Sequence, residues 1–401
     1  MYFHLITSID CNSECRYCYR KSYDDFGNDL NKTFKFDFSM PPRIRYSVEQ
    51  LKQFLARGKT RHTLTFYGGE PLMDIEKIKE IMDNVDARYM MQTNGKLLDK
   101  LPKEYVNRFE LMLISIDGDK KLTDFNRGEG TYDKVISNIA LIRKNGFIDN
   151  SGVHSILLPE LSDGQFCQIG SINRRIVHKG ELIARMVVDE HSDVFESVKH
   201  LFSIGFDAVH WQLDAGFYQQ DFKSRNFSEF SKKYNAEVSQ LLDYWVEIMQ
   251  KEHKVLKIYP FLGIFESLYY NKTEKLRCGS GFANYTIAPN GKISVCPIMH
   301  DATVFQAGDI LTDNPDNLKQ IFVEEPCKSC DIYGLCGGRC LYANKANLWP
   351  KEGQDLICNT VRHLIDSIRD KIPDIKELIK QCKITEKQFD YEKYTGPEII
   401  P

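Results

Sequence analysis

The stretch Cys11-Asn12-Ser13-Glu14-Cys15-Arg16-Tyr17-Cys18 holds three cysteines at the spacing C-x3-C-x2-C near the start of the chain. Three thiolates this close can reach three corners of one iron–sulfur cube, because thiolate is the usual ligand of such clusters. One iron then has no protein ligand, and an open metal position is where a substrate or cosubstrate binds. A structural zinc site is the alternative, but it needs a fourth nearby Cys or His, and His4 lies on the other side of the run.

The bulk composition is that of an ordinary globular protein. The chain has 401 residues, 42% of them hydrophobic, and a formal net charge of -3. This charge creates no field that would attract nucleic acid or an anionic membrane surface. The apolar run at residues 1–9 lacks a basic flank and stops at Asp10, so it predicts neither a targeting signal nor a membrane span. We therefore expect a cytoplasmic protein.

The twelve cysteines do not suggest a disulfide scaffold, because the chain is large and most of them stand in tight groups. Ten have spacings that suit metal clusters, whereas Cys167 and Cys382 stand alone. A lone cysteine is usually a small, half-buried hydrophobic residue. Such thiolate groups predict a reducing, oxygen-poor cytosol.

Strands and helices are expected to alternate through the first half of the chain. Strands are predicted at residues 2–9, 64–67, 88–93, 111–116, 183–188 and 208–213. Helices are predicted between them at residues 47–57, 74–85, 97–106, 132–143 and 192–204, the last capped by Ser192. This alternation indicates parallel βα units. Six strands are too few for an eight-stranded barrel, so we predict an α/β fold with a partial (β/α)6 TIM-type barrel.

Polar side chains gather at the predicted strand ends, where parallel barrels carry their working residues. By alternation, Ser115 and Asp117 share one face of the fourth strand, and His210, Gln212 and Asp214 share one face of the sixth. We take this face as the interior, with His210 and Gln212 as candidate substrate contacts. The alternative is that these groups are merely hydrogen-bonded within a wide core.

Two motifs follow predicted strands: C-x3-C-x-aromatic-C comes after the N-terminal strand, and Gly68-Gly69-Glu70-Pro71 comes after the second. Together they resemble the radical S-adenosylmethionine superfamily, and the resemblance extends over residues 1–215. It implies that Cys11, Cys15 and Cys18 ligate a 4Fe-4S cluster whose fourth iron chelates S-adenosylmethionine. It further implies reductive cleavage to a 5'-deoxyadenosyl radical that abstracts hydrogen from a substrate.

The same resemblance implies which residues contact S-adenosylmethionine. Tyr17 is expected near the adenine, and Arg185 beside the methionine carboxylate, unless it is a surface arginine at a strand edge. Asn94 is a weaker candidate, because Asn-Gly after a strand is also a good turn. The remaining contacts are Gly68, Gly69 and Glu70 at the methionine ammonium, and Ser115 and Asp117 at the carboxylate or ribose.

The C-terminal third contains seven cysteines in a characteristic order, namely Cys278, Cys296 after Gly291, then Cys327, Cys330, Cys336 and Cys340, and finally Cys358. This order resembles the SPASM extension, a cysteine-rich domain that binds auxiliary iron–sulfur clusters. The family pattern assigns Cys327, Cys330, Cys336 and Cys358 to a distal cluster, and Cys278, Cys296 and Cys340 to a cluster nearer the barrel. Many relatives have a further cysteine shortly after the position of Cys278, but residues 279–284 contain none. We therefore expect three 4Fe-4S clusters, the proximal auxiliary one with an open iron, unless Cys167 or Cys382 fills it.

The predicted domains are a barrel over residues 1–225 with an insertion at about 145–182, a helical linker region at 226–272, the SPASM domain at 273–365, and a C-terminal helix and tail at 366–401. A zinc ribbon, the alternative for the third unit, leaves three thiolates unexplained. A β-hairpin is expected at residues 284–296, a packing helix at 225–252, and a tail helix at 361–378.

The resemblance to anaerobic sulfatase-maturating enzymes and ribosomal-peptide maturases implies an enzyme that modifies a residue of a peptide or protein, with crosslinking through the open cluster as one outcome. The alternative is a radical enzyme of small-molecule or cofactor biosynthesis. A non-catalytic electron carrier would leave Gly68 to Pro71 unexplained. The expected partners are an electron donor such as flavodoxin or ferredoxin, and a separate leader-peptide-binding protein unless residues 145–182 or the tail recognise the substrate.

Overall fold

We describe the protein from a computed structural model, in which residues 1–18, 34–37, 39–147, 180–214, 225–347, 351–394 and 401 are placed. Most of the predicted insertion at 145–182, together with Cys167, lies outside these residues. Within the described part, no helix is both long enough and apolar enough to cross a membrane.

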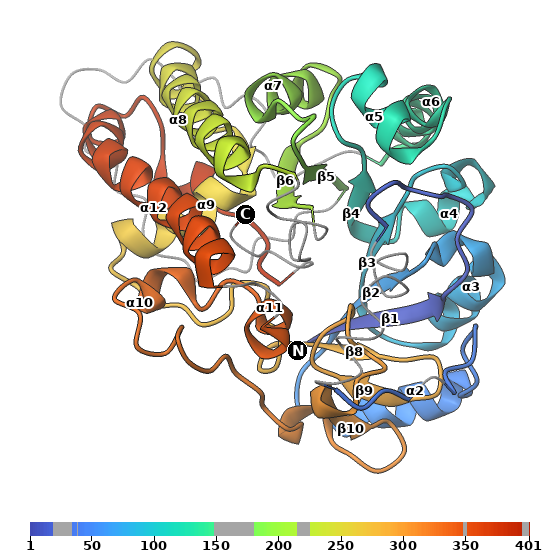
Figure 1. Ribbon diagram of the computed structural model, residues 1–401. Helices are drawn as coiled ribbons and strands as arrows, with labels where there is room; N and C mark the ends of the chain where they lie inside the picture. The colour runs from blue at the N-terminus through green and yellow to red at the C-terminus, as the bar shows by residue number, and fades with distance from the viewer. Residues whose placement is uncertain (19–33, 38, 148–179, 215–224, 348–350, 395–400) are drawn as a thin grey trace.

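The fold is built on six parallel strands that pair in chain order (Figure 1). The strands are β1 (Tyr2–Ser8), β2 (Thr63–Gly68), β3 (Arg88–Thr93), β4 (Phe109–Ser115), β5 (Glu181–Val188) and β6 (Ala208–Leu213). The predicted α/β partial barrel is therefore confirmed. Its strands match the predicted positions closely, since each is a short apolar run bounded by turn residues.

The sheet continues beyond these strands at both edges. At one edge β7 (Lys257–Ile258) pairs in parallel with β6. At the other, β8 (Asn284–Ile287) pairs in parallel with β1, and β9 (Lys292–Ser294) and β10 (Gln306–Asp309) follow in antiparallel fashion. The predicted hairpin exists, but its first strand also joins the barrel. The cysteine-rich region thus shares one ten-stranded sheet with the first half of the chain.

Helices cover the outer face of the sheet (Figure 1). They are α2 (Val48–Ala56), α3 (Ile75–Asn84), α4 (Lys103–Val106), α5 (Lys120–Arg127), α6 (Thr131–Lys144) and α7 (Val194–Ser203). The start of α2 is fixed by a capping box, in which the Gln50 backbone N–H donates to Ser47 Oγ at 3.2 Å and the Ser47 backbone N–H donates to Gln50 Oε1 at 2.8 Å. Outward side chains such as Phe3 and Phe66 are fully buried beneath these helices.

Around the barrel, two predicted helices differ from the structure and one further helix was not predicted. Residues 97–106 form a short 3-10 turn and then α4, because Pro102 has no N–H and keeps Leu101 extended. The cap of α7 is Asp193, because the Ser192 hydroxyl instead donates to Asp189 Oδ1 at 3.0 Å. Helix α5 was not expected at all, because its sequence is mostly polar.

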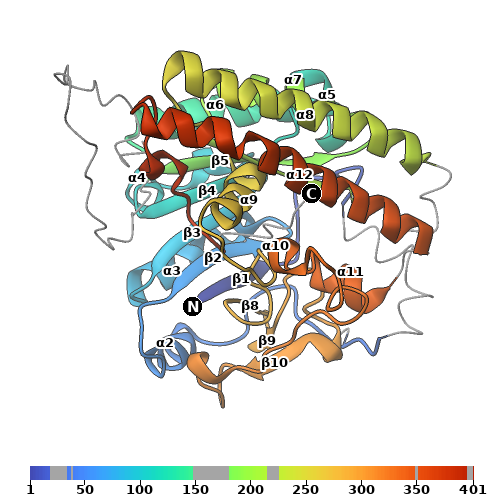
Figure 2. The same cartoon turned by 90° about the vertical axis from the view of Figure 1, so that its left-hand side faces the viewer.

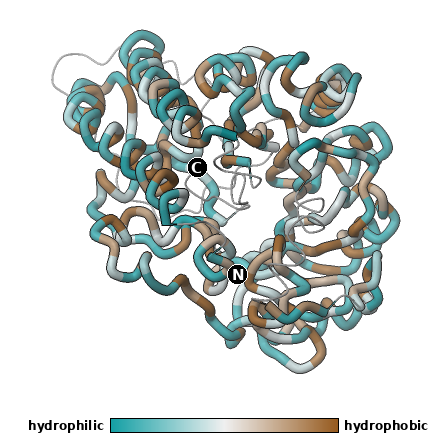
Figure 3. The backbone as a smooth tube through the Cα atoms, in the orientation of Figure 1, coloured by the Kyte–Doolittle hydropathy of each residue, from teal (hydrophilic) through white to brown (hydrophobic). Residues whose placement is uncertain are grey.

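The second half of the chain adds α8 (Phe227–Glu252), α9 (Tyr259–Tyr269), α10 (Tyr333–Cys336), α11 (Leu341–Ala346) and α12 (Lys351–Lys380). Helices α8 and α12 pack along each other beside the barrel (Figures 1 and 2). Hydrophilic and hydrophobic stretches alternate along both helices, as amphipathic packing requires (Figure 3). Helix α12 begins ten residues earlier than predicted. Ile357 is buried in the core, and its burial stabilises the helical conformation of these additional residues.

The inner face of the barrel is partly apolar and partly polar. Leu111 and Leu113 face inward with Ile183 and Met90 in one small buried cluster. Trp211, on the neighbouring strand β6, belongs to the outer core instead. The side-chain alternation predicted for the fourth and sixth strands therefore agrees with the structure, and the polar ends of these strands face a common interior.

Candidate functional site

The first cysteine loop leaves the C-terminal end of β1 and rests on the turn after β2. The Gly69 backbone N–H donates to the Ser8 carbonyl at 2.9 Å, and the Glu70 N–H donates to the Asp10 carbonyl at 2.8 Å. Further along the loop, the Arg16 N–H donates to the Asn126 carbonyl at 2.8 Å. Backbone bonds to two neighbouring units therefore fix the path that carries the cysteines.

The two glycines of this turn are required by the protein's own backbone. A Cβ on Gly68 would lie 2.1 Å from the Ser8 carbonyl oxygen, and Gly68 has a φ of 141°. A Cβ on Gly69 would lie 2.4 Å from the Asp10 carbonyl oxygen and 2.5 Å from that of Ile9. The family resemblance placed these two glycines at the methionine ammonium of S-adenosylmethionine. The structure shows that glycine is also needed at both positions for the close approach of the cysteine loop.

Glu70 joins the ends of β2 and β3. Its fully buried carboxylate accepts hydrogen bonds from Thr93 Oγ1 at 2.7 Å, the Asn94 N–H at 2.7 Å and the Leu72 N–H at 3.0 Å. Burial raises the pKa of Glu70 to about 7. Asn94 in turn donates from Nδ2 to Asn12 Oδ1 at 2.7 Å, and so ties the cysteine loop to β3.

A cavity of about 210 Å³ opens beside this loop. Its wall includes seven of the side chains and glycines that the sequence pointed to as S-adenosylmethionine or substrate contacts, namely Tyr17, Gly68, Gly69, Asn94, Ser115, Arg185 and Gln212. The same wall contains the three N-terminal cysteines, Cys11, Cys15 and Cys18. It also contains Ile298, Cys340 and Tyr342 from the cysteine-rich region. One cavity therefore faces cysteines from both halves of the chain.

Asp117 does not line the cavity but stands behind it. Its buried carboxylate accepts from Arg127 Nε and Nη2, both at 2.9 Å, from the Val187 N–H at 3.0 Å, and from the Tyr17 hydroxyl. The Arg127 guanidinium lies over the Tyr17 ring, 5.3 Å from its centroid. Asp117 thus holds two residues that do reach the cavity.

Arg127 is a cavity residue that the sequence analysis missed. It ends α5, a helix that was not predicted, and its charge is neutralised by Asp117, ten positions earlier. The only feature of the sequence that could have indicated its role is an arginine that follows the turn from Ser115 to Gly118. A charge in a polar stretch is usually on the surface, and so the signal is weak.

Arg185 and His210 are neighbours in register on β5 and β6. Arg185 is 5% exposed and lines the cavity, opposite Ser115 in the β4–β5 register. His210 is also buried, but it precedes Gln212 by two residues on the same face of β6 and does not line the cavity. Burial, aided by the charge of Arg185, holds the pKa of His210 well below its ordinary value. His210 is therefore a neutral imidazole in the barrel interior.

The cysteines of the C-terminal region fall into two groups. Burial, and then the proximity of Cys340 and Cys278, raises the pKa of Cys296 to about 12. In the other group, burial and then the proximity of Cys336, Cys358 and Cys330 raises the pKa of Cys327 to about 11.

These two groups are the sets that the sequence pattern predicts, and Cys296, Cys327, Cys330, Cys336, Cys340 and Cys358 among them are free thiols. Grouped free thiols suit thiolate-ligated clusters, since a bound metal lowers the thiol pKa and deprotonates it. Among the described residues, no three His, Cys, Asp or Glu side chains are arranged to hold a single metal ion. The ligand roles themselves remain predictions.

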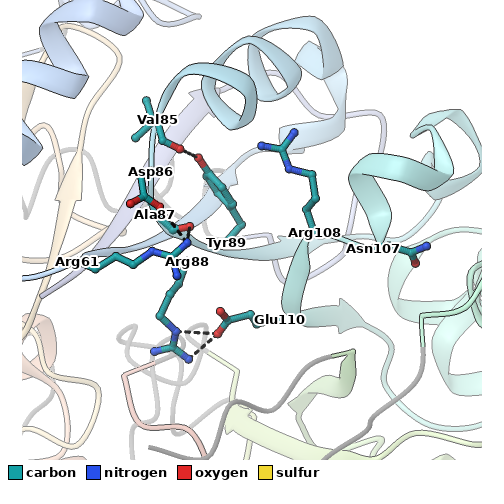
Figure 4. A pocket seen from close by; sticks show the side chains of 9 residues that line it. All are labelled: Arg61, Val85, Asp86, Ala87, Arg88, Tyr89, Asn107, Arg108 and Glu110. Carbon is teal, nitrogen blue, oxygen red and sulfur yellow. Dashed lines mark hydrogen bonds and ion pairs between the residues drawn. The ribbon is translucent and has the colours of Figure 1, made fainter.

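A second cavity, of about 380 Å³, lies at the opposite end of the sheet, where β3 and β4 begin (Figure 4). Its charged groups are already paired. Arg88 Nη2 lies 2.6 Å from Glu110 Oε2, and Arg61 Nη2 lies 3.0 Å from Asp86 Oδ1. This cavity therefore offers no unmatched charge to a ligand.

Residues 5–172 match the radical SAM superfamily. A segment of 157 residues is 27% identical to an uncharacterised protein of Methanothermobacter thermautotrophicus and covers 36% of this chain and 55% of that protein. A segment of 137 residues is 31% identical to an uncharacterised protein of Archaeoglobus fulgidus and covers 31% of this chain and 28% of that protein. The matches thus span about half the length, or less, of these relatives.

Solved structures with a similar fold align over almost the whole chain. Native anSMEcpe with bound AdoMet (S-adenosylmethionine) aligns with a TM-score of 0.66 at 18% identity, over 95% of this chain and 100% of that one. Native anSMEcpe with bound AdoMet and the Kp18Cys peptide aligns with a TM-score of 0.66 at 17% identity, over 94% and 99%. At this identity the likeness shows the fold, including the region that follows the barrel.

Proposed function

We propose that this chain, whose residues 5–172 match the radical SAM superfamily, is a radical SAM enzyme that modifies a residue of a peptide or protein by abstracting hydrogen from it. The observation that carries the proposal is the cavity shared by the N-terminal cysteines and Cys340. A substrate in this cavity touches both halves of the chain. The arrangement suits a reaction that begins at the first cysteine group and ends near the second.

The first cysteine group would hold the initiating cluster. Cys11, Cys15 and Cys18 are its ligands, and the loop bonds to Gly69 and Glu70 keep them at the cavity. When bound there, the 4Fe-4S cluster and S-adenosylmethionine supply a 5'-deoxyadenosyl radical. The chain's own task is to position the cosubstrate and to keep water away from it.

Two arginines contribute to the cavity wall. Arg185 and Arg127 both line it, and both are buried. We assign Arg185 to the carboxylate of S-adenosylmethionine, because a guanidinium binds a carboxylate through two parallel hydrogen bonds. Arg127 is held by Asp117 and lies over Tyr17, so it supports the aromatic ring that we place near the adenine. Gly68, Ser115 and Asn94 complete this wall.

The two C-terminal cysteine groups would hold auxiliary clusters. Cys327, Cys330, Cys336 and Cys358 supply four ligands, whereas Cys278, Cys296 and Cys340 supply three. Residues 279–284 contain no cysteine, and Cys340 lines the cavity. We therefore propose an open iron on the proximal cluster, at which a substrate donor can bind for crosslink formation. Electrons would come from a flavodoxin or ferredoxin in a reducing cytoplasm.

The peptide substrate is supported by the anSMEcpe structure, which holds the Kp18Cys peptide in a similar fold. A separate leader-peptide-binding protein would then present the substrate. The alternative is a small-molecule substrate, which would need a closed pocket, whereas a peptide would need an open trough.

The test is anaerobic reconstitution followed by two measurements, 5'-deoxyadenosine formation and the mass of candidate substrates. Cys11→Ala should abolish 5'-deoxyadenosine formation, because it removes one ligand of the initiating cluster. Cys340→Ala should leave that cleavage in place but stop product formation. Cys382→Ala, which removes a cysteine outside all three groups, should keep both activities, and loss of product in this variant would instead make Cys382 the fourth ligand of the proximal cluster.

Three results would argue against the proposal. No S-adenosylmethionine cleavage by the wild-type enzyme would favour an electron carrier. Full product formation by the Cys340→Ala variant would remove the role of the proximal group. A mass change in small metabolites but in no peptide would select the alternative substrate class.

A further inference from the structure

Helix α5 contacts two consecutive residues of the first cysteine loop. The Arg16 backbone N–H donates to the Asn126 carbonyl at 2.8 Å, and the Arg16 guanidinium donates to Asn126 Oδ1 from Nε at 3.3 Å and from Nη2 at 3.1 Å. The same guanidinium lies over the Phe125 ring, 4.8 Å from its centroid. The next helical residue, Arg127, lies over the ring of Tyr17. Both residues between the second and third cysteines of the loop are therefore held by one turn of this helix.

The Arg16 guanidinium also forms an ion pair with Asp189, the residue that follows β5. Asp189 Oδ2 accepts from Arg16 Nη2, and the Asp189 side chain is fully buried. The other carboxylate oxygen, Oδ1, is used by its own turn, since it accepts from the His191 N–H at 2.9 Å and from the Ser192 hydroxyl at 3.0 Å. A buried carboxylate is costly without an opposite charge, and Arg16 supplies that charge. The pair therefore ties the cysteine loop to β5 as well as to α5.

Strand β5 also carries Arg185, which lines the cavity together with Cys15 and Cys18. Arg185 stands four residues before Asp189 in the sequence. In the proposed function, Arg185 binds the methionine carboxylate of S-adenosylmethionine, and the cluster on the cysteine loop chelates the same methionine part. Two groups that bind one small molecule must keep a fixed separation, because a displacement of about 1 Å can cost about a hundredfold in rate. The Arg16 ion pair directly links the two elements that carry these groups.

We propose that Arg16 is a positioning residue: through its ion pair with Asp189 it sets the separation between the first cysteine loop and Arg185, and so fixes the S-adenosylmethionine site. Neither Arg16 nor Asp189 lines the cavity, so both act through the loop rather than by contact with the cosubstrate. This inference rests on the proposed function, because it concerns the cosubstrate of that reaction. It predicts that iron loading and S-adenosylmethionine binding can be separated by mutation.

The first test is equilibrium dialysis of S-adenosylmethionine against the anaerobically reconstituted full-length enzyme, with the iron content measured in the same samples. Arg16→Met removes the charge and the hydrogen bonds of the side chain. It should load as much iron as the wild type, because all three cysteines of the loop remain. Its dissociation constant for S-adenosylmethionine should rise by roughly tenfold or more. KM for S-adenosylmethionine should rise by a similar factor, whereas the rate of 5'-deoxyadenosine formation at saturation should change much less.

A double-mutant cycle tests whether the two residues act as one pair. Asp189→Asn removes the partner charge and keeps a side chain of similar size. Alone it should weaken S-adenosylmethionine binding, and the double variant with Arg16→Met should lose no more affinity than Arg16→Met alone. Arg16→Lys keeps the charge but lacks the planar fork of donors, so its affinity should lie between those of the wild type and Arg16→Met.

Arg143→Met is the matched control. Arg143 forms an ion pair with Asp207, and Asp207 Oδ2 accepts from the Leu182 N–H at 2.7 Å, so this pair lies at the opposite end of β5. Arg143 also donates to the Gly180 carbonyl at 3.1 Å. Its removal should lower the stability of the protein and leave the affinity for S-adenosylmethionine unchanged.

The outcomes separate this inference from the function on which it rests. A wild-type enzyme that holds iron but binds no S-adenosylmethionine would overturn both. If the wild type binds S-adenosylmethionine and Arg16→Met binds it with unchanged affinity, only the positioning role of Arg16 is overturned. Additive losses in the cycle, a loss of iron that parallels the loss of binding, or an equal loss of affinity in Arg143→Met would overturn that role as well.

Discussion

Gly69→Ala should displace the cysteine loop without changing any cysteine. The added methyl group would lie 2.4 Å from the Asp10 carbonyl oxygen, whereas real Cβ atoms keep at least 3.0 Å from such neighbours. The Asp10 carbonyl must therefore move by at least about 0.6 Å, which is 3.0 minus 2.4. Gly69 does not have a positive φ, so the effect is steric.

The magnitude follows from the contacts that move. Overpacking against rigid backbone costs about 1–3 kcal/mol. The Gly69 and Glu70 hydrogen bonds to the loop, worth about 0.5–1.5 kcal/mol each, are weakened as well. We expect a loss of about 2–5 kcal/mol in the free energy of unfolding. We also expect a large loss of S-adenosylmethionine binding, because the displaced loop carries Cys11.

The assays are urea denaturation, and equilibrium dialysis of S-adenosylmethionine against the anaerobically reconstituted enzyme. Gly205→Ala is the matched control. Its φ of 95° makes alanine strained, but no atom lies within 4 Å of the new methyl group. The control should therefore lose stability and keep its affinity. If Gly69→Ala binds S-adenosylmethionine as tightly as the wild type and unfolds at the same urea concentration, the reasoning is refuted.

Three further outcomes follow from the site. Arg127→Met should lower the free energy of unfolding by about 3–5 kcal/mol in urea, because it leaves the buried Asp117 carboxylate unpaired, and adding Asp117→Asn should restore part of the loss. Burial raises the pKa of Glu70 from 4.5 to about 7, so the folded state binds the extra proton between these values. The wild type should therefore lose about 3 kcal/mol relative to Glu70→Gln as the pH rises from about 4.5 through 7, and the loss should level off above about pH 8. Cys358→Ala should remove about four of roughly twelve iron atoms per chain, and an unchanged iron content would contradict its assignment as a ligand.

The strands of the barrel could be predicted because each is a short buried run with turn residues at its ends. The prediction for residues 88–93 coincides with β3, and the one for 208–213 coincides with β6. The bounds of a helix were harder to predict where tertiary packing outweighs the helix propensity of the local sequence. Helix α12 begins at Lys351 because of contacts made by its first turns, and these contacts do not appear in the periodicity of the segment.

Some residues of the cavity wall could be predicted, because the spacings of the cysteines and of the Gly-Gly turn are rare in other kinds of site. What a pattern does not give is the partner of each side chain. Asp117 was expected at the ligand, but its carboxylate is used by Arg127 and Tyr17. Tyr342 and Ile298 reach the cavity from the far end of the chain, and no local signal marks them.

The pairing of β1 with β8 has a consequence for how the protein is made. Tyr2 is in register with Asn284, so the strand that carries the first cysteine loop obtains its second neighbour only after most of the chain has left the ribosome. Contacts between such distant residues form slowly, because a long loop must close first. Until then one edge of β1 is open to other chains. Metal delivery to the first loop is therefore best timed after synthesis is complete, and host strains with slower translation or more chaperone should yield more loaded enzyme.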